Sequence, residues 1–215
     1  MTGAQHVAQA RVRVLRWLNE RLRLGFSEWN APGYYVEDIM PLLNLADFAV
    51  DKDIRTRAAM VMDLLVLDLA VHTQGGGFAG SAGRAYFEQK NCLWEQPTRD
   101  ALEILFGQQH HFVESSNAAA FLATSPGYRP ADALIAIAAA GPERFTTRSR
   151  VSIDFDEAHL YGVGTDTAED MEFWWSRAAF ATKQTIITSR RVAAEARLMD
   201  TPPFSKILPL VEKVA

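Results

Sequence analysis

The chain has 215 residues, a formal net charge of −4 and 48% hydrophobic residues, as expected of a globular protein. It contains no long basic run, so we expect no nucleic-acid partner. Its single cysteine, Cys92, excludes an internal disulfide, and a structural zinc site cannot be built from that thiol alone.

The terminal and apolar segments bear on where the protein is found. Residues 1–17 are polar and charged and lack the apolar core of a signal peptide. The longest apolar stretch is interrupted by Asp63 and Asp68, so we expect no membrane span and no membrane partner. The compartment stays open, with the cytoplasm as the default, and we predict neither a cofactor nor a metal. The sequence ends at KILPLVEKVA without an obvious stop signal, which is typical of a fragment or module of a longer protein.

Three long helices are predicted over residues 5–24, 34–50 and about 53–73. Apolar residues recur near helical spacing in the first, and the third is too long for a strand and lacks Gly and Pro. Pro41 is expected near the start of the second helix, where proline is tolerated. The connection between the second and third helices is short, so these helices should be antiparallel neighbours.

A glycine-rich loop follows the third helix, over residues 75–90. Such a loop is entropically costly to order unless its backbone must pass close to something or side chains anchor it. We therefore predict that Phe78 is buried against the end of the bundle. We also predict that Arg84 points into the same space as Glu28 and Asn30.

Shorter helices are predicted over residues 97–106, 116–123 and 131–140, and the pattern then changes. The sequence SRVSIDF alternates like a strand, so a short irregular or β segment is expected near 151–155. Helices over 167–191 and 191–199 complete the chain. The predicted fold is mainly α, built from antiparallel helical hairpins. We expect a single helical domain over 1–215, with helical hairpins in 1–145 and the strand-like segment plus C-terminal helices in 146–215.

Alternate connections of such a chain lie at the same end of the bundle if successive helices are antiparallel. The loops at 25–33, 75–96 and 124–130 then share one end, while the tight turns and His110–His111 share the other. Functional residues tend to sit on loops held by a rigid scaffold. The polar and aromatic residues gathered at the first end are Glu28, Trp29, Asn30, Tyr34, Tyr35, His72, Ser81, Arg84, Tyr86, Lys90, Tyr128 and Arg129.

This arrangement resembles the α/α toroid of helical hairpins in six-hairpin glycosidases and in alginate- and heparin-type polysaccharide lyases. The resemblance rests on the rhythm of the hairpins and on the residue types at one end, over roughly residues 5–141. Because the chain is shorter than a ring of six hairpins, the resemblance implies a partial toroid. It also implies a carbohydrate-active domain whose partner is a polysaccharide or oligosaccharide.

The chemistry of uronate elimination fits the residue types at this end. The reaction needs donors that neutralise the substrate carboxylate, together with a base and an acid. The predicted catalytic residues are Glu28, Asn30, His72, Arg84 and Tyr86, with Tyr35 as a second candidate for proton transfer. The predicted substrate-binding residues are Trp29, Tyr34, Tyr35, Lys90, Tyr128 and Arg129. Glycoside hydrolysis is the alternative reaction, and it would pair Glu28 with Asp38 or Glu88.

Two other interpretations stay open. In the first, Trp29, Tyr34 and Tyr35 only close the end of the bundle, and Arg84 pairs with a carboxylate, either Glu28 or Asp38. In the second, the chain is a non-catalytic scaffold or assembly module that forms oligomers or larger assemblies through its C-terminal helices. The features that favour the second are the adjacent Trp174 and Trp175 and the apolar tail Ile207–Val211.

Overall fold

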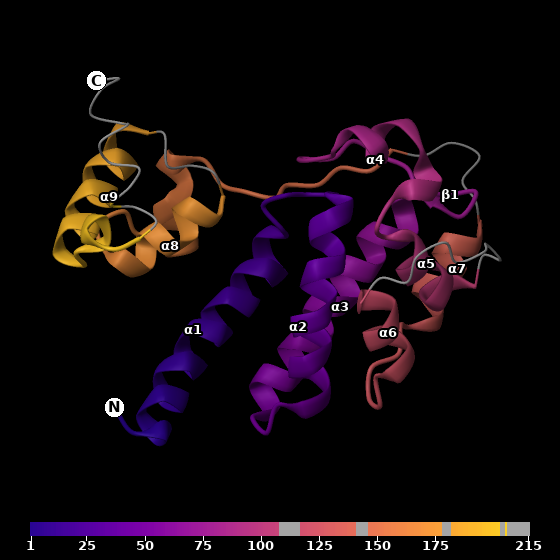
Figure 1. Cartoon of the computed structure of the whole chain (residues 1–215), viewed down its shortest axis with the longest axis horizontal. Helices are drawn as coiled ribbons and strands as arrows, with labels where there is room; N and C mark the ends of the chain where they lie inside the picture. Colours follow the sequence, from indigo (N-terminus) through magenta and orange to yellow (C-terminus); the bar gives the residue numbers. More distant parts are fainter. Residues whose placement is uncertain (108–116, 141–145, 178–181, 203–204, 206–215) are drawn as a thin grey trace. The chain divides into compact units, whose positions relative to one another are not determined.

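The computed structural model describes residues 1–107, 117–140, 146–177, 182–202 and 205. It is mainly α, as predicted, with one short antiparallel pair of strands (Figure 1). The chain divides into two compact units, Met1–Val151 and Ser152–Ala215. This division lies close to residue 146, where the sequence pattern changes. The single domain over 1–215 stays a prediction. His110–His111 and Ile207–Val211 lie outside the described residues.

Helix α1 (Gly3–Leu24) begins at a reciprocal cap between Thr2 and Gln5 and ends at Gly25. Gly25 has φ of +63°, a left-handed conformation that closes the helix without a side-chain clash. The N-terminal half of α1 is exposed, and its C-terminal half packs on α3 (Lys52–His72). An ion pair of 2.5 Å between Arg11 and Asp51 joins the exposed half to the start of α3.

Helix α2 (Pro32–Phe48) begins two residues before the predicted start at residue 34, at a proline. Proline suits the first position of a helix, because the missing N–H has no partner there anyway. The expectation that Pro41 lies near the start of the helix is wrong, since Pro41 is inside it. Pro41 and Glu37, which precedes it by one turn, are both exposed, so the carbonyl that loses its hydrogen bond faces water.

Helix α3 is the centre of the first unit. The Asp51 carboxylate caps it by accepting hydrogen bonds from the Asp53 and Ile54 amides at 2.9 and 3.2 Å. Helices α2 and α3 run antiparallel side by side, as predicted (Figure 1). The fully buried residues Ala58, Val61, Met62, Leu65, Val66 and Leu69 of α3 form much of the core.

The rest of the first unit is built from short elements. They are β1 (Thr73–Gln74), β2 (Gly77–Phe78), α4 (Phe87–Asn91), the 3-10 helix η1 (Leu93–Glu95), α5 (Arg99–Phe106), α6 (Asn117–Thr124) and α7 (Asp132–Ala140). In the hairpin, Thr73 pairs with Phe78 and Gln74 with Gly77. Phe78 is buried in the core, so the predicted anchoring of the glycine-rich loop is confirmed.

The second unit contains η2 (Phe155–Tyr161), α8 (Ala168–Ser176), α9 (Lys183–Glu195) and η3 (Leu198–Asp200). The predicted helix 167–191 is therefore two helices, because Thr182 caps a new start by accepting a hydrogen bond from the Thr185 amide. The separate helix 191–199 is also wrong, since α9 runs through residue 191. Residues 146–154 are irregular, which was one of the two predicted alternatives.

The adjacent tryptophans of α8 face different surroundings, because neighbouring residues of a helix point about 100° apart. Trp174 is buried against Phe155 and Phe173, whereas Trp175 is partly exposed and donates to the Ser189 hydroxyl. None of the described helices is long and apolar enough to cross a membrane.

Candidate functional site

Two loops of the first unit meet in direct backbone contact, which explains two of the glycines between them. The Gly83 amide donates to the Trp29 carbonyl at 2.7 Å. A Cβ on Gly83 would lie 3.3 Å from the Trp29 nitrogen, and one on Gly80 would lie 3.1 Å from the His72 ring. The glycine-rich loop thus passes close to residues 28–30, as the sequence predicted.

Arg84 contacts the side chains of Glu28, Tyr34 and Tyr86 at the surface of this end. Its guanidinium lies 3.0 Å from a Glu28 carboxylate oxygen and donates to the Tyr34 hydroxyl at 2.8 Å. It also lies over the Tyr34 ring, 5.3 Å from the ring centre. The predicted meeting of Arg84 with Glu28 is confirmed, and Glu28 rather than Asp38 is its ion-pair partner. We call Glu28, Tyr34, Arg84 and Tyr86 the surface cluster.

The two tyrosines of the surface cluster share a hydrogen bond, and this bond moves their pKa values in opposite directions. The interaction with the Tyr86 hydroxyl raises the pKa of Tyr34. The interactions with the Tyr34 hydroxyl and with Arg84 lower the pKa of Tyr86. A pair of groups shifted apart in this way is the arrangement expected of a proton acceptor beside a proton donor.

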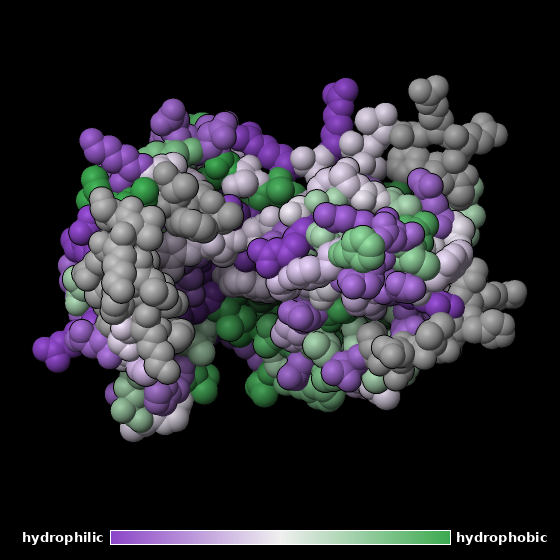
Figure 2. All heavy atoms as spheres, turned by 45° about the horizontal axis from the view of Figure 1, so that its top comes forward, coloured by the Kyte–Doolittle hydropathy of each residue, from purple (hydrophilic) through white to green (hydrophobic). Residues whose placement is uncertain are grey.

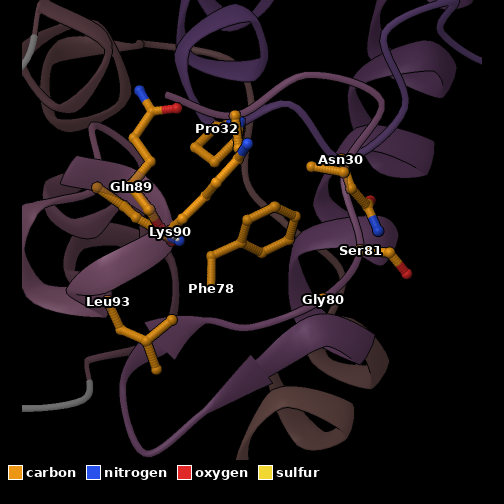
Figure 3. Close-up of a pocket in the computed structure, with 11 residues that line it drawn as sticks. Asn30, Pro32, Phe78, Gly80, Ser81, Gln89, Lys90 and Leu93 are labelled. Carbon is orange, nitrogen blue, oxygen red and sulfur yellow. Dashed lines mark hydrogen bonds between the residues drawn. The ribbon is translucent and has the colours of Figure 1, made fainter. Parts of the chain in front are cut away.

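A pocket of about 320 Å³ is lined by residues of the same two loops (Figure 3). Its lining residues are Asn30, Pro32, Phe78, Gly80, Ser81, Ala82, Ala85, Gln89, Lys90, Leu93 and Gln96. Figure 3 shows Asn30 and Ser81 on one side of Phe78, with Gln89, Lys90 and Leu93 on the other. Arg84 follows this lining in the chain, between Ala82 and Ala85. The pocket and the surface cluster are therefore parts of one region.

Asn30 is the most unusual residue of the pocket. Its side chain is fully buried, and neither its Nδ2 nor its Oδ1 atom has a hydrogen-bond partner among the described residues. Its φ is +54°, a region that asparagine enters more easily than most residues. Leaving a buried polar group unpaired costs about 1–3 kcal/mol. Each buried polar group without a partner in a native protein calls for an explanation, and a functional site is one of them.

The neighbours of Asn30 repeat this pattern. Glu28 Oε2 and Trp29 Nε1 are also buried without a partner in the described part of the chain, as is Gln96 Oε1 across the pocket. Unpaired donors and acceptors thus lie together on residues 28–30. Residues 28–30 thus offer a carboxylate oxygen, an indole N–H and an amide, which together can bind a ligand with hydroxyl and carboxylate groups.

His72 and Tyr35 are held in the core. The two ring nitrogens of His72 lie 2.8 Å from the Asp68 carbonyl and 3.2 Å from the Thr147 hydroxyl. Tyr35 is fully buried and donates to the Asp68 carboxylate at 3.0 Å. Burial raises the pKa of both Tyr35 and Asp68. These contacts give His72 and Tyr35 a supporting position behind the pocket, with Trp29 packed edge-on against His72.

Tyr128 and Arg129 lie elsewhere, so the prediction that loop 124–130 shares this end is wrong. The Tyr128 amide donates to Asp47 and its hydroxyl donates to Asp63. Asp47 is next to the last residue of α2, whose 17 residues span about 25 Å from the Pro32 end. The parity rule fails because α5 and α6 have eight residues each and do not cross the whole bundle in turn.

A partly buried carboxyl lies behind the surface cluster. Burial raises the pKa of Asp38 to about 7, against the opposing effect of Arg21, and Glu37 and Glu28 add to the rise. Arg21 is itself buried, stacked on Trp17 at 5.0 Å and Phe26 at 5.8 Å. Asp38 is thus the carboxyl best suited to act with Glu28, whereas Glu88 is exposed on α4.

The sequence did not identify Gln89, Gln96 or the carboxyl-rich surroundings of Arg21 as parts of this region. Gln89 had one local signal, since it lies three residues after Tyr86 and its side chain accepts from the Tyr86 amide at 3.0 Å. Within the described ranges, no group of three or more His, Cys, Asp or Glu side chains is placed to hold a metal ion.

No protein-family model, curated protein or solved structure matches the chain.

Proposed function

We propose that the end of the first unit formed by loops 25–33 and 75–96 binds and processes a saccharide that carries a carboxylate. The observation that supports this most is the fully buried, unpaired amide of Asn30 in a pocket of about 320 Å³. The Lys90 side chain lines the same pocket and supplies a positive charge. Pockets of this size are typical of small-ligand sites with a few convergent polar groups.

The reaction class that fits best is β-elimination at a uronate ring. Asn30 and Lys90 would hold the carboxylate and so acidify the proton on the adjacent carbon. Tyr86, whose pKa is lowered, would take that proton, and Tyr34 would return one to the leaving oxygen. The bond from C4 to the bridging oxygen breaks while a double bond forms between C4 and C5. Arg84 would stabilise the tyrosinate beside it.

A substrate screen tests the proposal. Uronate polysaccharides are mixed with the protein, and the ultraviolet absorbance of the unsaturated product is followed. Tyr86→Phe should abolish turnover and leave the fold intact, because Tyr86 is exposed. Tyr161→Phe, in the second unit, is the matched control. A wild-type protein that neither binds nor cleaves any uronate polymer, or a Tyr86→Phe variant with full activity, would contradict the proposal.

Hydrolysis is the second candidate, and the raised pKa of the partly buried Asp38 carboxyl, to which Glu28 contributes electrostatically, favours it. A carboxyl with a pKa of about 7 can donate a proton at neutral pH, while Glu28, paired with Arg84, would act as base or nucleophile. Release of reducing ends from neutral glycans, lost in Asp38→Asn, would support hydrolysis. Unsaturated products would support elimination instead.

The assembly interpretation also stays a proposal, and exposed apolar side chains of the second unit favour it. Trp175, Ile186 and Ile187 are exposed there, on α8 and α9. Light scattering of the wild type and of an Ile186→Asp, Ile187→Asp variant would test it. A monomer in both cases would oppose an assembly role for these helices.

A further inference from the structure

We infer that the site takes an internal stretch of a polysaccharide rather than a single sugar, with Phe87 and Trp94 each stacking on a ring outside the pocket. This inference rests on the proposed function, because it names the length of the ligand bound there. It comes from the two exposed aromatic residues of α4 and η1, which the surface cluster and the pocket do not use.

Phe87 is placed at the rim of the pocket by its position on α4. It lies three residues before Lys90, so the two side chains are neighbours on one helix face. Lys90 lines the pocket, and the preceding residue, Tyr86, belongs to the surface cluster. Yet 76% of Phe87 is exposed, and α4 has no buried residue at all. Packing within the described structure therefore does not account for an aromatic residue at this position.

Trp94 belongs to the next element and directly follows a lining residue of the pocket. Leu93 lines the pocket, and Trp94 follows it in η1 with 44% of its surface exposed. Arg99 holds Trp94 from one side, because its guanidinium lies 5.9 Å from the ring centre and donates to the Trp94 carbonyl at 3.2 Å. A ring that is exposed but held needs little further ordering to bind a ligand.

The chemistry of this rim suits a saccharide chain. The C–H faces of sugar rings are apolar and flat, so they stack on aromatic rings, while the hydroxyl groups at their edges stay in water. In Figure 2, the surface at the place that α4 takes in Figure 1 shows hydrophobic residues lying among hydrophilic ones. A pocket of about 320 Å³ leaves most of a long chain outside, where Phe87 and Trp94 lie.

Binding of uronate oligosaccharides of graded length, measured by calorimetry, tests the inference. Galacturonate and mannuronate series from the monosaccharide to the hexasaccharide serve as probes. We expect wild-type affinity to rise with length beyond the disaccharide. Phe87→Ala and Trp94→Ala should each weaken hexasaccharide binding about fivefold to tenfold, and tenfold corresponds to 1.4 kcal/mol. Neither change should alter disaccharide binding.

Two substitutions elsewhere serve as matched controls. Phe48→Ala removes a 68% exposed phenylalanine at the opposite end of α2, and Trp175→Ala removes a 40% exposed tryptophan of the second unit. Both should bind every length as the wild type does. Equal wild-type affinity for all lengths, or equal losses for short and long ligands in the rim variants, would overturn the inference while leaving the proposed function standing. Absence of binding at every length would overturn both.

Discussion

Replacement of Asn30 by glycine should make the protein more stable and less able to bind its ligand. The Asn30 amide is buried with both polar atoms unpaired, which costs about 1–3 kcal/mol. Glycine removes that cost and adopts the φ of +54° without strain, but it loses about 0.5–1 kcal/mol in backbone entropy. The expected net gain is therefore about 0–2.5 kcal/mol in the free energy of unfolding.

Thermal unfolding followed by calorimetry measures this difference. For a chain of this length, a gain of 1 kcal/mol raises the Tm by roughly 2–4 °C. Asn30→Ala is the matched control, because it also removes the amide but puts a Cβ at a left-handed position, which costs about 1–2 kcal/mol. The glycine variant should have a higher Tm than the alanine variant.

Saccharide binding is then measured on the same two proteins. Both should lose affinity to a similar extent, since both lack the amide. A glycine variant that is destabilised by more than about 1 kcal/mol would refute the reasoning, because it would show that the Asn30 amide is paired in the folded protein. A more stable variant with unchanged binding would remove Asn30 from the site.

Three more predictions follow from the electrostatics. Arg84→Ala should leave the Tm close to that of the wild type, because the side chains of Arg84 and Glu28 are 49% and 34% exposed and an exposed ion pair adds little stability. The same change should abolish turnover, and a collapse in Tm would contradict this prediction. The pKa of Asp38 is raised to about 7, so the stability that Asp38 contributes is present below about pH 4 and lost as the pH rises through 7. Urea unfolding midpoints should therefore fall between about pH 4 and 7 in the wild type and change less over that range in Asp38→Asn. For Asp170, burial acts against ionisation, but hydrogen bonds from the Thr167 hydroxyl and from nearby backbone amides lower its pKa. The stability that Asp170 gives the second unit is thus present above about pH 4 and lost in acid, and Asp170→Asn should make calorimetric unfolding less acid-sensitive than in the wild type.

The long helices were predictable because apolar residues recur at helical spacing in their sequences and a capping or closing residue marks an end. Asp51 caps α3 and Gly25 closes α1. The apolar face of α3 packs on α2 and on the C-terminal half of α1. Helix α4 was missed because none of its residues is buried, so it has no apolar period. The hairpin at 73–78 was missed because strands of two residues show no alternation.

The parts of the candidate site that depend on two loops at the same end of the bundle were predictable. The parts that depend on contacts between residues far apart in the sequence were not. The meeting of Glu28 and Arg84 followed from two long loops at one end of the bundle. The unpaired state of the Asn30 amide depends on where the Gly80 loop passes, which no local pattern encodes. Tyr128 was misplaced because its position is set by Asp47 and Asp63, residues 81 and 65 positions away.

The hydrogen bond between His72 and Thr147 has a consequence for the order in which the site is assembled. The two residues are 75 positions apart, and Thr147 lies in the irregular segment 146–154. During synthesis, α1, α2 and α3 can pack before that segment leaves the ribosome, since domains fold as their residues emerge. The hydrogen bond between His72 and Thr147 would then form only after α1, α2 and α3 have packed. The region behind the pocket would thus be completed late, when the helices that carry it are already fixed.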